Sequence, residues 1–454
     1  MKIAHIVRRF TFSEWGGTES VVWNIALQQK SQGLTPEILC TAALDRIGCE
    51  IVNGITIRRF PYVYPYFPMP GKDRTALDKK GGNPFSPELL RYLKHGNFDI
   101  FHLHAGGRIA NYSIRLGKKL NIPCIMSLHG GSCAIPKKEM ELMLKPLKHK
   151  FSYGGIIDRL FQAHHLPESQ ADLLLALSRE EAQKLRERYP EKKIELFPNG
   201  ILHRELPEEG DFRKQYKIPE DQKVILCISR IDYQKNQKIL LKILPEFPDT
   251  HLLLIGPVTA DWYHNEILET AEKLGVNNRL TIIPGLPPDS ITLLQALKTA
   301  SCFILPSRHE PFGIAALEAL DAELPLIASN VGGLRDFLID GKNALLFEDN
   351  DTADLLEAYQ KAEVQRESLI AGGKMTAQEY NWKRISEKLT DIYRELVGRN
   401  RFFTSENITE SSAGSNDTCR TVRTFCRKTA LLCTIVILKM AAKIRKDSLE
   451  RLKA

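Results

Sequence analysis

Short runs of uninterrupted apolar residues recur along the chain, each closed by Gly, Pro, Ser or Asn and followed by a helical pattern. Hydrophobicity that is continuous rather than alternating marks strands buried on both faces, as in parallel sheets. Strand–helix alternation of this kind predicts doubly wound α/β units. The runs expected to form strands are 3–7, 98–104, 123–129, 173–178, 194–199, 224–229, 251–256, 280–285, 302–307, 324–329 and 344–347.

This pattern restarts near residue 220, after the polar stretch 203–210, which we interpret as an interdomain linker. A chain of 454 residues is too long for one ordinary core. The sequence therefore predicts an α/β fold of two Rossmann-like doubly wound domains facing each other across a cleft, plus a basic C-terminal tail. We expect the first domain at 1–205, the second at 206–380, a helix returning toward the first domain at 381–399, and a linker with an amphipathic tail at 400–454.

Charge and cysteine content narrow the class of protein. Residues 401–454 hold eleven basic and five acidic residues and so carry most of the net charge of +8. A nucleic-acid binder would show its basic stripe on the folded domains, so no nucleic-acid partner is expected. The nine cysteines are scattered without a Cys-x-x-Cys pair, which fits a reducing cytoplasm. No run reaches the ~20 apolar residues of a membrane-spanning helix, and no signal peptide is recognisable.

The most specific motif is Pro306-Ser-Arg-His-Glu310-Pro-Phe-Gly313-Ile-Ala-Ala-Leu-Glu318. A strand is expected to end before it, and a helix is expected to begin around Gly313. Glu310 then lies in the loop, and Glu318 lies about one and a half turns into the helix. Backbone N–H groups at a helix N-terminus suit phosphate or sugar oxygens, and carboxylates accept hydrogen bonds from sugar and ribose hydroxyls.

This string resembles the Glu-x7-Glu signature of glycosyltransferase family 4, a large family of retaining enzymes with the two-domain GT-B fold. The resemblance covers roughly residues 1–398. Other blocks that resemble the family are Trp15-Gly16-Gly17-Thr18-Glu19, Phe197-Pro-Asn199-Gly200, Ser229-Arg230-Ile-Asp-Tyr-Gln-Lys235-Asn236, Leu324-Pro-Leu-Ile-Ala-Ser-Asn-Val-Gly-Gly333-Leu-Arg-Asp336 and Asp340-Gly-Lys-Asn-Ala-Leu-Leu346. Two positions depart from it: Asn236 stands where Gly is common, and Leu202 where Asp is common.

The resemblance implies roles for the second domain. Arg230 and Lys235 would grip the donor diphosphate and neutralise charge on the departing nucleotide, which agrees with the chemistry of a leaving diphosphate. Glu318 would bind the ribose hydroxyls, and Glu310 would lie near the transferred sugar. The backbone amides that would touch the sugar or phosphate belong to Phe312, Gly313 and Ile314.

The resemblance also implies roles for the first domain. Gly16 and Gly17 would let the backbone approach the donor closely, ahead of a helix with Thr18 as its expected N-cap. His129 would face the donor sugar and completes the predicted catalytic set with Glu310, Arg230 and Lys235. For His102 and His104, a packing role and an acceptor-side role both remain open.

No metal or cofactor is expected, because the nucleotide sugar is itself a substrate and the two cations serve the diphosphate. Asp349-Asn-Asp351 spells an Asp-x-Asp metal motif, but we interpret it as a polar turn that caps the next helix.

The acceptor side is less defined. The aromatic stretch 60–70 could stack on sugar rings or pin a long loop to the domain. Lysines between residues 137 and 150 suit an anionic membrane surface or a solvated face equally well. The tail has basic flanks around the apolar patch 430–438, the layout of a peripheral membrane anchor. A linker is expected at 404–418.

We therefore expect a retaining, metal-independent hexosyltransferase that moves a sugar from a nucleotide-diphosphate-sugar donor to a saccharide or lipid-linked acceptor, in cell-surface polysaccharide or glycolipid synthesis. It would be cytoplasmic and bound peripherally to the inner face of the membrane. The alternatives are a non-catalytic sugar-nucleotide-binding protein of the same fold and a nicotinamide-dependent oxidoreductase. The latter is disfavoured because Gly-x-Gly-x-x-Gly is absent from the first loop.

Overall fold

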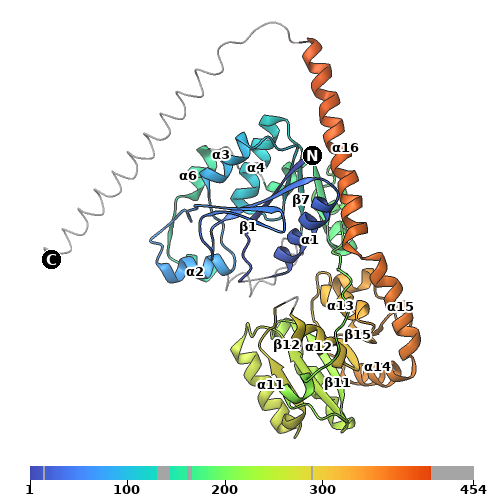
Figure 1. Cartoon of the computed structure of the whole chain (residues 1–454). Coiled ribbons are helices and arrows are strands. Elements are labelled where there is room, and N and C mark those ends of the chain that lie inside the picture. Colours follow the sequence, from blue (N-terminus) through green and yellow to red (C-terminus); the bar gives the residue numbers. More distant parts are fainter. Residues whose placement is uncertain (14–15, 130–143, 161–165, 288–289, 411–454) are drawn as a thin grey trace, which may run out of the picture. The chain divides into compact units, whose positions relative to one another are not determined.

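The computed structural model describes residues 1–13, 16–129, 144–160, 166–287 and 290–410, and of Leu160 and residues 400–410 the backbone alone. It contains one eight-stranded and one six-stranded sheet, formed by residues from successive parts of the chain (Figure 1). All strand pairs in the two sheets are parallel except β3–β4.

The eight-stranded sheet has the order β10-β9-β7-β6-β1-β2-β4-β3. Its strands are β1 (Lys2–Arg9), β2 (Thr35–Thr41), β3 (Gly48–Val52), β4 (Ile55–Phe60), β6 (Ile100–Leu103), β7 (Cys124–Ser127), β9 (Leu173–Ala176) and β10 (Ile194–Leu196). The helices of this region are α1 (Gly17–Ser31), α2 (Gly71–Lys79), α3 (Pro87–His95), α4 (Gly107–Leu120), α6 (Gly154–Leu160), α7 (Pro167–Gln170) and α8 (Arg179–Arg188). A short pair, β5 (Tyr66–Phe67) and β8 (Phe151–Ser152), stands apart from the sheet.

The six-stranded sheet has the order β13-β12-β11-β14-β15-β16. Its strands are β11 (Lys223–Ile228), β12 (Thr250–Ile255), β13 (Leu280–Ile283), β14 (Cys302–Leu305), β15 (Leu326–Ser329) and β16 (Leu345–Phe347). Its helices are α9 (Phe212–Tyr216), α10 (Lys238–Leu241), α11 (Asp261–Lys273), α12 (Ile291–Thr299), α13 (Ile314–Asp321), α14 (Thr352–Val364) and α15 (Arg366–Glu379). Short 3-10 turns include η2 (Tyr233–Lys235) and η5 (Gly332–Asp336).

Every expected strand is present, and burial on both faces explains this for the central strands. On β11, Val224 and Leu226 belong to one hydrophobic cluster, whereas Ile225 and Cys227 belong to the cluster on the opposite face. A strand covered on both sides reads as a continuous apolar run. The sequence prediction of parallel α/β sheets is confirmed.

The chain's last described helix, α16 (Trp382–Glu410), packs on the first sheet's core. Trp382, Ile385, Leu389 and Tyr393 share a buried cluster with Ile3 of β1. The helix also continues through residues 404–410, where the sequence predicted a linker, because no Gly or Pro interrupts residues 399–410. The rest of that linker and the basic tail lie outside the described residues. In the part of the chain that is described, no helix is both long and apolar enough to cross a membrane.

Candidate functional site

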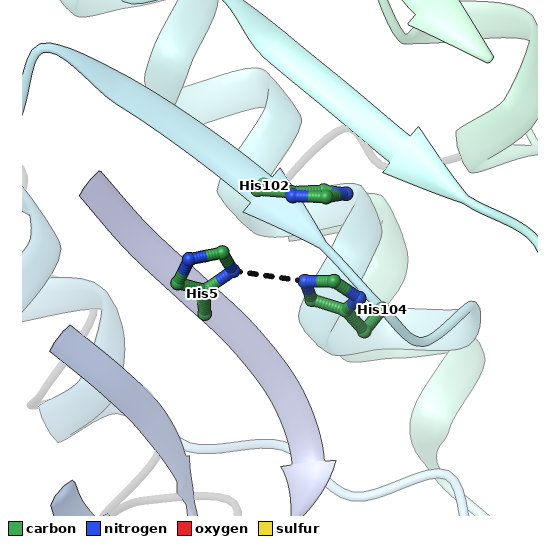
Figure 2. A group of neighbouring side chains, drawn as sticks. All are labelled: His5, His102 and His104. Carbon is green, nitrogen blue, oxygen red and sulfur yellow. Dashed lines mark hydrogen bonds between the residues drawn. The ribbon is translucent and has the colours of Figure 1, made fainter. Parts of the chain in front are cut away.

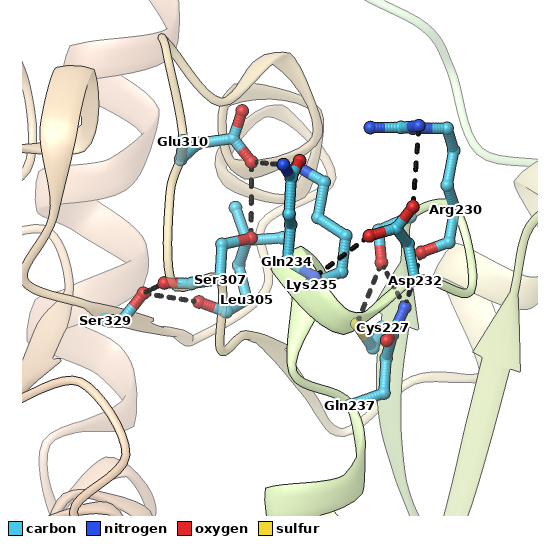
Figure 3. Close-up of polar contacts among 11 residues, drawn as sticks. Cys227, Arg230, Asp232, Gln234, Lys235, Gln237, Leu305, Ser307, Glu310 and Ser329 are labelled. Atoms are coloured by element: carbon cyan, nitrogen blue, oxygen red, sulfur yellow. Dashed lines mark hydrogen bonds and ion pairs between the residues drawn. The ribbon is translucent and has the colours of Figure 1, made fainter. Parts of the chain in front are cut away.

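Lys235 and Glu310 meet at the carboxyl edge of the six-stranded sheet. Lys235 ends the turn after β11, and Glu310 lies in the loop after the neighbouring strand β14. The Lys235 Nζ atom lies 2.6 Å from the Glu310 Oε2 atom, and the two side chains are only 14% and 11% exposed. Figure 3 shows the two side chains pointing toward each other from the two loops.

The Glu310 loop is fixed by close backbone contacts. The Ser307 hydroxyl donates to the Glu310 carboxylate at 3.3 Å, and the Gly333 N–H donates to the Glu310 carbonyl at 2.9 Å. Gly332 has φ +51, and a Cβ atom there would lie 2.2 Å from the Glu310 carbonyl oxygen. The glycine at position 332 is therefore required for the close approach of the two loops.

Arg230 leaves the same sheet edge as Lys235 and is 42% exposed. Its backbone is held firmly, because Gln237 donates to the Arg230 carbonyl at 2.7 Å and to the Ser229 hydroxyl at 2.8 Å. Its guanidinium lies 3.7 Å from Asp232, whose carboxylate caps the turn that carries Lys235 (Figure 3). The backbone of Arg230 is thus fixed while its cationic end remains accessible.

Arg308 belongs to this site but was not predicted from the sequence. Its guanidinium donates to the side chains of Asn236 at 3.0 Å and Asn350 at 3.1 Å and lies over the Tyr233 ring at 4.6 Å. Asn236 has φ +53, a backbone conformation that Asn tolerates better than most residues, which explains how it replaces the Gly common at this position. Arg308 therefore ties together the loops that follow β11, β14 and β16.

Helix α13 begins where the motif predicts. Gly313 is its N-cap with φ +99, and Phe312 before it is only 2% exposed. The Glu318 side chain lies in the middle of the helix, is 28% exposed and lies 3.5 Å from the Arg204 guanidinium. The loops at one edge of this sheet carry Arg230, Lys235, Glu310, Phe312 and Gly313. Ile314 begins the helix, and Glu318 follows within it.

Gly16 and Gly17 start helix α1, so the expected N-cap at Thr18 is wrong. Gly16 is the N-cap residue, and no side chain caps the helix. The helix therefore begins two residues earlier than expected, and Glu19, with its carboxylate 3.4 Å from Arg9, is buried in its first turn beside Gly16. A Cβ atom at position 16 would lie 3.0 Å from that carboxylate.

His129 lies just after β7, half-buried, against a group of buried histidines. Its ring stacks on His104 with centroids 5.4 Å apart, and its Nε2 atom lies 3.2 Å from the His104 Nδ1 atom. His102 and His104 are inside the protein, at 0% and 4% exposure, so the packing role predicted for them is the one the structure supports. Burial lowers the pKa of His129 from 6.5 to about 4.

His5, His102 and His104 form the one group of metal-capable side chains found among the described residues, with ligand atoms within 4.8 Å of one another (Figure 2). Every ring nitrogen of His102 is already engaged, by Tyr393 at 2.5 Å and Ser127 at 2.7 Å. Both ring nitrogens of His5 are also paired. Hydrogen bonds account for the group without a cation.

The Asp-x-Asp string lies at the start of α14. Asp351 caps this helix by accepting from the N–H groups of Ala353 and Asp354, as expected.

The aromatic stretch 60–70 holds its loop to the domain through buried tyrosines. Tyr62 and Tyr64 are buried, and both hydroxyls donate to the Asp78 carboxylate, at 2.7 and 2.8 Å. Of the predicted basic stretch, residues 137–143 lie outside the described residues. Lys145 and Lys148 are exposed, whereas the Lys150 side chain is 8% exposed and pairs with Asp73 at 2.7 Å.

A hollow of about 410 Å³ opens at the carboxyl ends of β1, β2 and β4. Phe12, 44% exposed, forms part of its wall, and the buried Arg59 holds Asp45 at 3.0 Å and Glu50 at 2.5 Å. Its further lining residues are Thr11, Ser13, Arg46, Ile47, Gly48 and Cys49.

Two family models match adjacent stretches of the chain. The model for Glycosyltransferase Family 4 matches residues 15–203, and the model for Glycosyl transferases group 1 matches residues 208–393. One curated relative, D-inositol 3-phosphate glycosyltransferase 1 of Catenulispora acidiphila, is 24% identical over 411 residues, which cover 85% of this chain and 93% of the relative.

Solved structures agree on the fold. Sucrose-phosphate synthase from Thermosynechococcus elongatus superposes with a TM-score of 0.66 at 20% identity, covering 88% of this chain and 99% of that one. Anabaena HepE in complex with UDP and glucose gives a TM-score of 0.61 at 15% identity, covering 87% and 100%. The matching architecture is the GT-B fold of two Rossmann-like domains. With both family models matched in order along its length, the chain belongs to the group 1 and family 4 glycosyltransferases.

Proposed function

We propose that this glycosyltransferase is a retaining, metal-independent hexosyltransferase that uses a nucleotide-diphosphate-sugar donor and a saccharide or lipid-linked acceptor. The observation that carries the proposal is the 2.6 Å contact between Lys235 and Glu310, with Arg230 exposed beside it. A leaving diphosphate needs fixed positive charge, and two cations on one sheet edge supply it.

In this proposal each residue has a distinct task. An ammonium group has three N–H donors, so Lys235 can hold the Glu310 carboxylate and still donate to phosphate oxygens. Arg230 adds a planar guanidinium that can bind phosphate in a bidentate manner. Glu310 faces the sugar, and its carboxylate stabilises positive charge at the anomeric carbon as the bond to the diphosphate breaks.

The N-terminus of α13 completes the donor site. Backbone N–H groups of Phe312, Gly313 and Ile314 would contact sugar or phosphate oxygens, and Glu318 would bind the ribose hydroxyls. On the first sheet, Gly16 and Gly17 would let the backbone approach the donor, and His129 would contact the sugar. The chemistry needs no metal or cofactor, because the protein's own cations serve the diphosphate.

The hollow beside Phe12 supports a saccharide acceptor. An exposed aromatic ring next to fixed carboxylates and a guanidinium offers a stacking surface together with hydrogen-bond partners for hydroxyls. The two acids and two arginines that line it balance in charge, which favours a neutral ligand.

The proposed domains are 1–205 and 206–380, followed by the helix at 381–399 and the tail at 400–454.

The composition of residues 411–454 supports attachment of that tail to the inner face of the cytoplasmic membrane, for polysaccharide or glycolipid synthesis. The full chain should sediment with anionic vesicles, and a chain truncated after residue 410 should not. Equal sedimentation of both chains would contradict it.

A thermal-shift experiment tests the donor proposal. The full chain would be titrated with UDP, GDP, ADP and NAD, of which UDP is the nucleotide seen in Anabaena HepE. One nucleoside diphosphate should raise the Tm, and Arg230→Ala should lose that rise. Lys273→Ala, which removes an exposed charge from the same domain, should retain it. Stabilisation by NAD alone would indicate the oxidoreductase alternative. If the chain binds a nucleoside diphosphate but releases none from any sugar nucleotide, the non-catalytic alternative would be indicated.

A further inference from the structure

A row of hydrogen-bonded side chains runs from helix α1 through the interior to His129. Gln29 of α1 lies with Oε1 2.8 Å from the His5 Nε2 atom, and the His5 Nδ1 atom lies 3.0 Å from the His104 Nε2 atom. The row ends at His129, whose Nε2 atom lies 3.2 Å from the His104 Nδ1 atom. Figure 2 shows the central bond, between His5 on β1 and His104 just after β6.

The first member sets the direction of all the others. An amide oxygen can only accept, so the His5 Nε2 atom must carry the proton and donate to Gln29. The His5 Nδ1 atom is then an acceptor, and His104 donates to it from Nε2. The His104 Nδ1 atom is left as an acceptor, and His129 must donate to it from Nε2.

The direction of the row depends on the orientation of the Gln29 amide. The Gln29 Oε1 atom faces the His5 Nε2 atom, and the Gln29 Nε2 atom is buried without a hydrogen-bond partner among the described residues. The opposite orientation would reverse every bond in the row.

The row has a single direction only if each imidazole ring is neutral, with one proton. Gln29 and His5 are 0% exposed and His104 is 4% exposed. Burial lowers the pKa of His5 to about 4 and the pKa of His104 well below its ordinary value of 6.5. At neutral pH each imidazole therefore has one donor and one acceptor, as the row requires.

We propose that Gln29, His5 and His104 form a directional hydrogen-bond relay that holds His129 in its Nε2–H tautomer, leaving Nδ1 of His129 as a hydrogen-bond acceptor. Gln29, His5 and His104 are positioning residues, since they act through His129. Within the described residues, no contact engages the Nδ1 atom of His129.

The relay defines the kind of group that His129 can bind. An unprotonated Nδ1 atom accepts from a hydroxyl and repels the lone pairs of a phosphate or carboxylate oxygen. This part of the inference rests on the proposed function and assigns to His129 a hydroxyl of the sugar rather than the diphosphate.

The tautomer can be measured without any ligand. In the full chain labelled with 15N-histidine, nitrogen chemical shifts distinguish the two tautomers, and His129→Gln identifies the His129 signals. His129 should show protonated Nε2 and unprotonated Nδ1. Gln29→Glu, whose carboxylate can only accept, should keep this pattern, whereas Gln29→Leu should yield a mixture of both tautomers. His251, which has its own partners Gln222 and Thr281 on the other sheet, reports that each variant is folded.

Two results would overturn the relay: a His129 ring protonated at Nδ1, or a tautomer that Gln29→Leu does not change. A second titration tests the choice of ligand group. The Nδ1 signal of His129 should move with UDP-glucose and stay still with UDP. Movement with UDP alone would contradict the hydroxyl assignment, whereas failure of both to bind would exclude a UDP-sugar donor and leave the tautomer result standing.

Discussion

Lys235 and Glu310 lie 75 positions apart in the sequence, yet form a short ion pair because they follow adjacent parallel strands. Carboxyl ends of neighbouring parallel strands meet at one sheet edge, which is where ligands bind in this architecture. The pair is the most constrained element of the site, since both side chains are largely buried.

We expect Lys235→Ala to lower kcat/KM for sugar transfer by at least about 100-fold, because one fixed cation at the leaving diphosphate is lost. Steady-state release of nucleotide from the sugar nucleotide measures this. Lys238→Ala is a matched control, because Lys238 lies three residues further on and pairs with Glu266 at 2.7 Å, away from Glu310. Equal losses in the two variants would contradict a specific role for Lys235.

Gly332 and Gly341 allow backbone strain to be separated from steric clash. Both have positive φ, +51 and +69, but a Cβ atom at Gly341 would meet nothing within 4 Å. Gly341→Ala should therefore lower the free energy of unfolding by about 1 kcal/mol, from backbone strain alone. Gly332→Ala should cost clearly more, because the methyl group would overlap the Glu310 carbonyl. Urea unfolding measures both values, and equal costs would mean that the Glu310 loop moves aside freely.

At the scale of elements, burial decided which strands could be predicted. Strands covered on both faces, such as β11 and β14, were predicted because their sequences are continuously apolar. β2 was missed because its run contains Pro36 and Glu37. The edge hairpin β3–β4 was missed because β3 is mostly exposed, although Asn53-Gly54 between the strands, both at positive φ, is a strong hairpin signal.

The residues of the candidate site also fall into those that the sequence predicts and those that it does not. Lys235, Glu310 and the start of α13 were predictable, because they belong to a local strand–loop–helix motif. Arg308 was missed although it lies within the motif, because its contacts with Asn236 and Asn350 come from other loops. The relay behind His129 joins residues of α1, of β1 and of two further strand ends, so no local sequence pattern indicates it.

Helix α16 is an element whose contribution can be tested directly. Leu389 is fully buried in the cluster that also contains Ile3 and Val21 of the first sheet and α1. Leu389→Ala should lower the free energy of unfolding by about 2–5 kcal/mol, as expected for a buried leucine. Lys388→Ala changes the exposed neighbour and should have little effect. A stability unchanged by Leu389→Ala would show that the helix does not pack on this core in solution.

At the scale of the whole molecule, buried neutral histidines tie stability to pH. Burial lowers the pKa of His5, His129 and His251 from 6.5 to about 4. It also lowers the pKa of His102 and His104 well below 6.5. The folded protein therefore keeps these rings neutral at a pH where the unfolded chain protonates them.

This difference fixes the sign of the effect. Below pH 6.5 the unfolded chain binds protons that the folded chain excludes, so stability should fall as the pH drops from about 6.5 toward 4. Each histidine contributes a slope of up to about 1.4 kcal/mol per pH unit. The free energy of unfolding in urea, measured at intervals across this range, should therefore decrease steeply. His251→Gln should reduce the slope by the contribution of one histidine, whereas Val364→Ala, at an exposed position without a titratable group, should leave the slope unchanged. A flat profile would mean that the histidine cluster admits water and protons without unfolding, which would also leave the relay to His129 without the neutral rings it requires.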